Sequence, residues 1–222
     1  MPISRHLLGA ACGVVFVALM ACSSHDTRPT VGRDTQLAPP SILPSGEYPP
    51  GPYGFEVGKV IPNITVEGYV SGVPPWTSIA VKDYYDPGGQ KGIRGLYVTA
   101  SAPWCGGCQL EGKDLPGLYL NSYKARGARL LTMLLQGSSH EPASQATVDA
   151  WVTAYRTPYD LGVVDSALAL PPRAPGGGTA ALPFNYVVDP RTMKITQINM
   201  GEYFNGDTIP GLDSLLATNR SP

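Results

Sequence analysis

The sequence predicts an α/β domain in which helices flank a central mixed β-sheet. The chain has 222 residues, of which 43% are hydrophobic, enough for one domain with a sizeable core and too few to expect two. Segments with strand-like and helix-like patterns alternate along the sequence, which is typical of α/β folds. Residues 128–136 form a nearly continuous apolar run, as expected for a strand that is buried on both faces.

The expected strands are short apolar runs bounded by Gly, Pro or polar residues. An N-terminal β-hairpin extension is expected within residues 61–69, and an extended segment at 79–84. A β-rich run at 95–100 stops before Pro103. Further strands are expected at 128–136 and 161–165, and two more lie around a turn at Pro190 within residues 184–198.

Three helices are expected between and after these strands. The first begins at a pair of cysteines and ends near Gly127. The second covers residues 144–155, where Val148 and Trp151 recur at helical spacing with apolar residues one turn later. The last helix is expected at residues 209–218. The Pro/Gly-rich residues 171–181 are expected to form a loop.

The N-terminal residues have the pattern of an export signal. Arg5 and His6 precede residues 7–21, which carry no charge. This run of about 15 residues is shorter than the roughly 20 that a membrane-spanning helix needs, so we expect residues 1–21 to be a cleaved signal peptide. The following Cys22, with the preceding Leu19, resembles a bacterial lipobox, which implies a lipid anchor at Cys22 that inserts into a bilayer. The alternative is ordinary signal cleavage nearby, which would leave Cys22 as an exposed thiol.

Residues 22–53 are rich in Pro, Ser, Thr and Gly and lack apolar periodicity. Such a segment cannot bury enough surface to fold alone, so we expect a tether here and the folded domain at 54–222. Ser23 follows the cysteine, and in lipoproteins that resemble this chain this residue favours the outer membrane. The expected location is therefore the cell envelope, with the domain facing the periplasm.

The charge balance argues against a nucleic-acid partner. Lys and Arg number 16 and Asp and Glu number 17, so the formal net charge is −1. A domain that binds nucleic acid usually carries an excess of basic residues.

Two of the four cysteines remain available for chemistry in the expected mature protein. Cys12 lies in the signal peptide and Cys22 would carry lipid, which leaves Cys105 and Cys108. Two cysteines separated by two residues on the first turn of a helix can form a disulfide, and export places them where disulfides persist. Near the helix N-terminus the thiolate of Cys105 is stabilised, so Cys105 would attack a substrate disulfide and Cys108 would resolve the mixed disulfide.

The segment from Trp104 to Cys108 has the pattern W-C-x-x-C, and on it the chain resembles the thioredoxin superfamily. The most similar branch is the TlpA/ResA-like one, with redoxin-type peroxiredoxins as neighbours, and the resemblance covers roughly residues 55–216. It implies a thioredoxin fold and a thiol-disulfide oxidoreductase that reduces exported client proteins. It also implies an electron donor in the membrane or periplasm and no cofactor beyond the redox-active disulfide.

The resemblance assigns roles to further residues. Pro183 matches a cis proline that lies against the cysteine pair, so Leu182 and Pro183 would form a substrate-binding edge, with Trp104 covering one side of the site. Glu111 matches a Glu that helps move protons at the second thiol; the alternative is an exposed surface Glu. The family often has a helix-kinking Pro at the position of Lys113, whereas here Pro116 comes later, which puts the orientation of Glu111 in doubt.

Three other interpretations of the cysteine pair stay open. A purely structural disulfide is a poor staple because its loop is so short. A metal-binding or interaction module would need ligands beyond two thiolates, and only His25 and His140 follow the signal peptide. A peroxiredoxin-like peroxidase would have Thr three residues before the cysteine, where this chain has Ala102.

Overall fold

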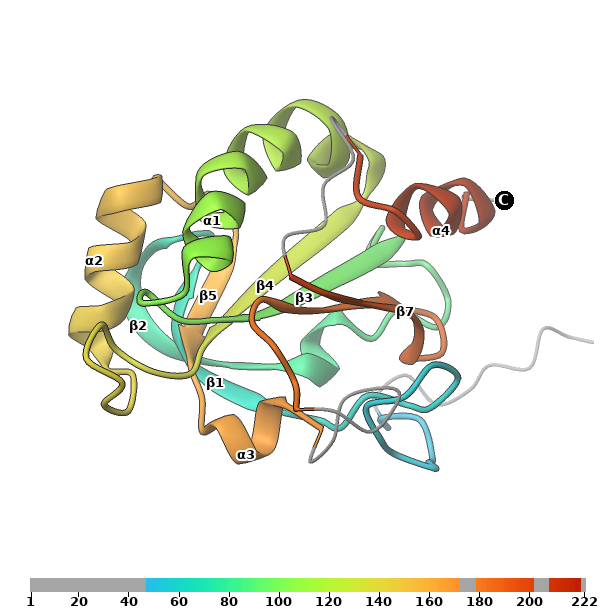
Figure 1. The fold of residues 1–222 in the computed structure, drawn as a ribbon. Coiled ribbons are helices and arrows are strands. Elements are labelled where there is room, and N and C mark those ends of the chain that lie inside the picture. The colour runs from blue at the N-terminus through green and yellow to red at the C-terminus, as the bar shows by residue number, and fades with distance from the viewer. Residues whose placement is uncertain (1–46, 172–178, 202–207, 221–222) are drawn as a thin grey trace, which may run out of the picture. The chain divides into compact units, whose positions relative to one another are not determined.

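The computed structural model describes residues 47–171, 179–201 and 208–220, and this part of the chain contains one seven-stranded mixed sheet (Figure 1). The strand order is β2-β1-β5-β4-β3-β6-β7. The predicted α/β class, with helices flanking a central sheet, is confirmed. The strands are β1 (Thr65–Val70), β2 (Val73–Ala80), β3 (Gly95–Ser101), β4 (Ala128–Leu134), β5 (Asp160–Val163), β6 (Phe184–Asp189) and β7 (Lys194–Met200).

The centre of the sheet is built from two parallel crossovers and an antiparallel pair. Strand β3 leads through helix α1 (Gly106–Leu118) to β4, and β4 leads through α2 (Gln145–Tyr155) to β5; both strand pairs are parallel. Strand β6 then pairs antiparallel with β3, and β7 pairs antiparallel with β6. Helix α4 (Leu212–Thr218) follows. Because β3 lies between β4 and β6, it is an interior strand of the sheet, and the turn that follows it is flanked by strands on both sides.

Each face of the sheet has its own apolar core. In β3 the side chains of Leu96, Val98 and Ala100 join one cluster, while Tyr97 joins another, as the two-residue period of a strand requires. The Tyr97 face is covered by α1, α2 and α4, and the opposite face by the short α3 (Ser166–Ala169) and the segment before β1 (Figure 1). Burial on both faces explains the apolar run predicted at 128–136.

Helix α1 begins at the cysteine pair as predicted but ends at Leu118, and two irregular helical turns continue the segment to the predicted end near Gly127. Pro116 lies inside the helix, where it cannot donate a backbone hydrogen bond. A π-helical turn at Tyr119–Tyr123 and a 3₁₀ turn at Lys124–Arg126 follow. The chain stops at Gly127, whose φ of +88° is favourable only for glycine.

Two segments differ from the sequence-based expectation. The N-terminal hairpin is confirmed but extends over β1 and β2, well beyond residue 69. The prediction that residues 79–84 are extended is wrong from Val81 on, because Val81–Tyr84 forms a 3₁₀ helix. Its two ends, Val81 and Tyr84, are buried, and the Asp83 carboxylate accepts a hydrogen bond from the Ala80 N–H at 2.8 Å.

Part of the predicted tether contacts the domain. Tyr48 packs against the core cluster that contains Ile61, and its hydroxyl donates a hydrogen bond to the Ile61 carbonyl at 2.6 Å. Residues 1–46, which hold the predicted signal peptide and Cys22, lie outside the described residues. None of the helices that the structure describes is long and apolar enough to cross a membrane.

Candidate active site

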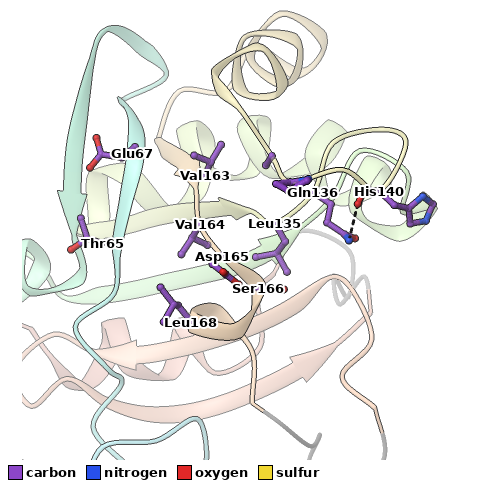
Figure 2. Close-up of a pocket in the computed structure, with 12 residues that line it drawn as sticks. Thr65, Glu67, Leu135, Gln136, His140, Val163, Val164, Asp165, Ser166 and Leu168 are labelled. Atoms are coloured by element: carbon purple, nitrogen blue, oxygen red, sulfur yellow. Dashed lines mark hydrogen bonds between the residues drawn. The ribbon is translucent and has the colours of Figure 1, made fainter.

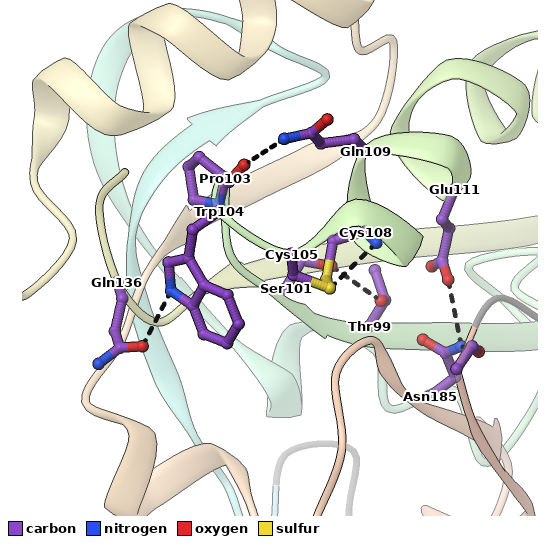
Figure 3. The surroundings of a disulfide bond; sticks show 11 residues. Thr99, Ser101, Pro103, Trp104, Cys105, Cys108, Gln109, Glu111, Gln136 and Asn185 are labelled. Atoms are coloured by element: carbon purple, nitrogen blue, oxygen red, sulfur yellow. Dashed lines mark hydrogen bonds between the residues drawn. A yellow bond between two sulfur atoms is a disulfide. The ribbon is translucent and has the colours of Figure 1, made fainter. Parts of the chain in front are cut away.

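A disulfide joins Cys105 and Cys108 at the N-terminus of α1 (Figure 3). Their Cα atoms are 5.2 Å apart. Cys105 is the N-cap residue, and its Sγ accepts a hydrogen bond from the Cys108 N–H at 3.1 Å. The Cys105 N–H donates to the Ala102 carbonyl, so a tight turn connects the end of β3 to the helix. The fold therefore places the first sulfur against backbone N–H groups that can stabilise a thiolate.

The two cysteines differ in their exposure. The first, Cys105, is 7% exposed, whereas Cys108 is fully buried. Both belong to an apolar cluster with Leu134 of β4 and Trp151 of α2. An attacking group can therefore reach Cys105 first, while Cys108 is protected by the helices.

Trp104 forms one wall beside the disulfide. Its side chain is 40% exposed, and its indole N–H donates a hydrogen bond to Gln136 Oε1 at 3.1 Å (Figure 3). The ring stacks on His140, with 4.6 Å between the ring centroids and 18° between the planes. Gln136 in turn donates to the His140 carbonyl at 3.2 Å. The sequence placed Trp104 at the site; Gln136 and His140 come from the loop after β4.

Glu111 is buried beneath the helix and does not lie on its surface. The side chain is 2% exposed, which excludes the alternative of an exposed surface Glu. Asn185 of β6 donates a hydrogen bond from Nδ2 to Glu111 Oε2 at 3.2 Å, and Figure 3 shows the two side chains pointing toward each other. The later position of Pro116 therefore does not turn Glu111 toward solvent.

Two buried tyrosines near Glu111 were not identified from the sequence. Burial raises the pKa of Tyr97 and of Tyr159 above the usual value for tyrosine, and the charge of Glu111 raises both further. Asn185 was also missed. The strand alternation of β3 and β6 could have placed Tyr97 and Asn185 on the helix-covered face, but only the folded structure shows that they approach Glu111.

The structure also brings the predicted substrate-binding edge to the cysteines. The Leu182–Pro183 peptide bond is cis. Pro183 is buried, and Leu182 packs against the cluster that contains Cys105 and Cys108. The Pro183 carbonyl accepts a hydrogen bond from the Gly201 N–H at 2.8 Å. Among the described residues no group of three or more His, Cys, Asp or Glu side chains could hold a metal ion.

Several solved structures have an arrangement of strands and helices similar to that of this chain. A secreted thiol-disulfide isomerase from Corynebacterium glutamicum matches with a TM-score of 0.55 and 16% identity, over 79% of this chain and 95% of that one. A candidate thiol:disulfide interchange protein DsbE from Chlorobium tepidum matches with a TM-score of 0.51 and 15% identity, over 75% and 99% of the two chains.

The chain has the thioredoxin fold. In this chain the disulfide follows the interior strand β3. A 2-Cys peroxiredoxin from Plasmodium vivax matches with a TM-score of only 0.48 and 13% identity, over 73% and 79% of the two chains, too weakly to bear on function. No family model matches the sequence, and no curated protein does. At these identities the likeness establishes the thioredoxin fold alone.

Proposed function

We propose that the chain is a thiol-disulfide oxidoreductase that reduces disulfides in exported proteins. The observation that supports this most directly is the Cys105–Cys108 disulfide at the start of α1, in which Cys105 is slightly exposed and Cys108 is fully buried. A purely structural disulfide does not require its two cysteines to differ in exposure. Disulfide exchange does, because one thiol must reach the client disulfide and the other must resolve the mixed disulfide.

The proposed reaction begins with both cysteines reduced. The Cys105 thiolate attacks one sulfur of a client disulfide, a new S–S bond forms to Cys105, and the other client sulfur leaves as a thiolate. Cys108 then loses its proton and attacks Cys105, which releases the second client sulfur. The client gains two electrons and becomes a dithiol, and Cys105 and Cys108 end as the disulfide that the structure shows.

Glu111 is the group that we assign to the second step. It follows Cys108 by three residues in α1, so both side chains lie on the same side of the helix. Since Cys108 is fully buried, water cannot easily take its proton, and a buried carboxylate one turn away can act as the base. Leu182 and Pro183 would form the edge along which the client chain lies.

We further propose that the protein works in the cell envelope, facing the periplasm. The support is the N-terminal pattern: a signal peptide at residues 1–21 and a lipid-modified Cys22, which would hold the domain at a bilayer, the outer membrane being favoured. The domain then needs an electron donor in the membrane or periplasm, and no cofactor beyond the cysteine pair.

The experiment that tests this function is a redox titration of the chain with Cys12 and Cys22 replaced by Ser, so that only the motif cysteines remain. We expect one reversible two-electron transition with a potential near about −270 mV, the value for thioredoxin. A potential near about −120 mV would instead indicate an oxidant of folding proteins.

Single-cysteine variants separate exchange from a structural disulfide. The Cys108→Ser variant should accumulate mixed disulfides with client proteins, whereas Cys105→Ser should form none. A pair that does not cycle between the two states, or equal and silent behaviour of the two variants, would refute the assignment.

A further inference from the structure

A groove lies where strands β4 and β5 end, and its lining includes Gln136 and His140, the two residues that contact Trp104 (Figure 2). Its volume is about 460 Å³, within the range of about 300–1,000 Å³ found for ligand sites. Its apolar lining comes from Leu135 at the end of β4, from Val163 and Val164 at the end of β5, and from Leu168 of α3. Leu168 is 58% exposed, so this side chain is available for a partner.

The groove adjoins the proposed active site through two of its lining residues, Gln136 and His140. The same Gln136 accepts the hydrogen bond from the Trp104 indole, and the same His140 stacks on the Trp104 ring. Trp104 directly precedes Cys105 in the chain. A polypeptide whose disulfide lies at Cys105 can therefore extend past Trp104 into the groove.

The charged side chains that line the groove are acidic. Glu67 of β1 and Asp165, the N-cap of α3, contribute carboxylates, and no Lys or Arg among the described residues lines the groove. Neither carboxylate is in an ion pair within the described part of the chain. One oxygen of Asp165 accepts the Ala167 N–H at 2.8 Å, while the residue itself is exposed.

We propose that this groove binds a segment of the client polypeptide that carries a Lys or Arg side chain close to the cysteine under attack. The proposal rests on the oxidoreductase function proposed above and adds the sequence preference of its client. A long basic side chain fits both parts of the lining. Its methylene stem can lie on Val164 and Leu168, and its cationic end can reach Glu67 and Asp165.

The test compares two synthetic cyclic peptides, each closed by one disulfide and identical except for Arg or Glu two residues after the first cysteine. The pre-reduced full chain is mixed with each peptide, and the second-order rate constant of the exchange is measured at physiological salt. We expect the Arg peptide to react about five- to tenfold faster than the Glu peptide, since each partly exposed charge pair contributes modestly. In the Glu67→Gln plus Asp165→Asn double variant this ratio should fall to about twofold or less.

The variants are chosen to preserve the fold. Asn is as good an N-cap as Asp, and Glu67 is exposed. Glu56→Gln removes the same charge from an exposed site outside the groove, so it should leave the preference for the Arg peptide unchanged. An undiminished preference in the double variant would overturn the proposal while the exchange activity itself stands.

If neither peptide reacts, the oxidoreductase function is refuted. Binding measurements then test the groove proposal separately. Calorimetry with linear peptides that carry Ser in place of Cys should then show tighter binding of the Arg peptide to the wild type than to the double variant. Equal or absent binding refutes the groove proposal. A dimer that forms through this face and excludes both peptides would also refute it.

Discussion

At the residue scale, Glu111 forms a buried hydrogen bond with Asn185. From the sequence, Glu111 could also have been an exposed residue on the surface of the helix. Residues three apart on a helix lie on the same side, so the sequence alone places Glu111 near Cys108. Asn185 is 74 residues away in the chain. Its approach depends on β6 pairing with β3 beneath α1, which no local pattern predicts.

Replacing Glu111 with Gln tests whether its carboxylate accepts the Cys108 proton. The amide keeps the shape and can still accept the Asn185 hydrogen bond, so the fold should be retained. We expect resolution of a preformed mixed disulfide at Cys105 to slow by about 100-fold at pH 7, the lower end for a lost general base. The rate should then rise with pH between 7 and 9, because the thiol must ionise without help. Stopped-flow measurement of thiol release checks both effects.

The first step of exchange provides the control for this variant. Attack by Cys105 does not use Glu111, so its rate constant should change by no more than about threefold, far less than the loss of a general base. Equal slowing of both steps, or an unchanged pH profile of the second, would reduce Glu111 to a structural role.

At the scale of elements, helix α1 packs closely on α2 through a glycine. A Cβ atom built on Gly112 would lie 2.9 Å from Trp151 Cζ2 and 3.0 Å from Tyr155 Cδ2. Trp151 is 4% exposed, so its ring has little room to move. The sequence predicted both helices, yet nothing in it indicated that Gly112 is their contact point, since this depends on how the two helices cross.

Gly112→Ala should therefore destabilise the domain despite the higher helix propensity of Ala. Overpacking costs about 1–3 kcal/mol, which exceeds the gain of about 1 kcal/mol from replacing Gly in a helix. Gly117→Ala is the matched control, because a Cβ there meets nothing within 4 Å. We expect its stability to be unchanged or to rise by up to about 1 kcal/mol. Urea unfolding of both variants measures the difference, and a stable Gly112→Ala protein would contradict the packing argument.

At the scale of the whole molecule, the strand and helix order was largely predictable and the sheet order was not. Periodicity locates β3, β4, α2 and α4 within a few residues, but it places the end of α1 too late and gives no sign of the short α3. It does not reveal that β1 pairs with β5, where Glu67 lies opposite Val163, or that Tyr48 packs against the core. These contacts join segments distant in sequence. The groove that Gln136 and His140 line depends on the same contacts, because β1 and β5 both line it as well.

Buried tyrosines make the fold as a whole sensitive to alkaline pH. Burial is the main cause of the raised pKa of Tyr84, Tyr97 and Tyr159, and nearby carboxylates add to it. In the unfolded chain these phenols ionise near about pH 10. Above that pH the unfolded state releases protons that the folded state keeps, so the stability they contribute is fully present below about pH 10 and is lost as pH rises.

Above about pH 10 we expect each of these three tyrosines to lower the free energy of unfolding of the oxidised protein by about 1.4 kcal/mol per pH unit, or about 4 kcal/mol per unit together. Burial also raises the pKa of Tyr48, Tyr123 and Tyr186, so these residues make the measured slope steeper. Urea unfolding between pH 9 and 11.5 measures this slope. The Tyr159→Phe variant should show a slope that is shallower by about 1.4 kcal/mol per pH unit, the contribution of one phenol. This change in slope does not depend on the stability of the variant at pH 7. A stability that is constant across this range would show that water reaches the tyrosine hydroxyls in the folded protein.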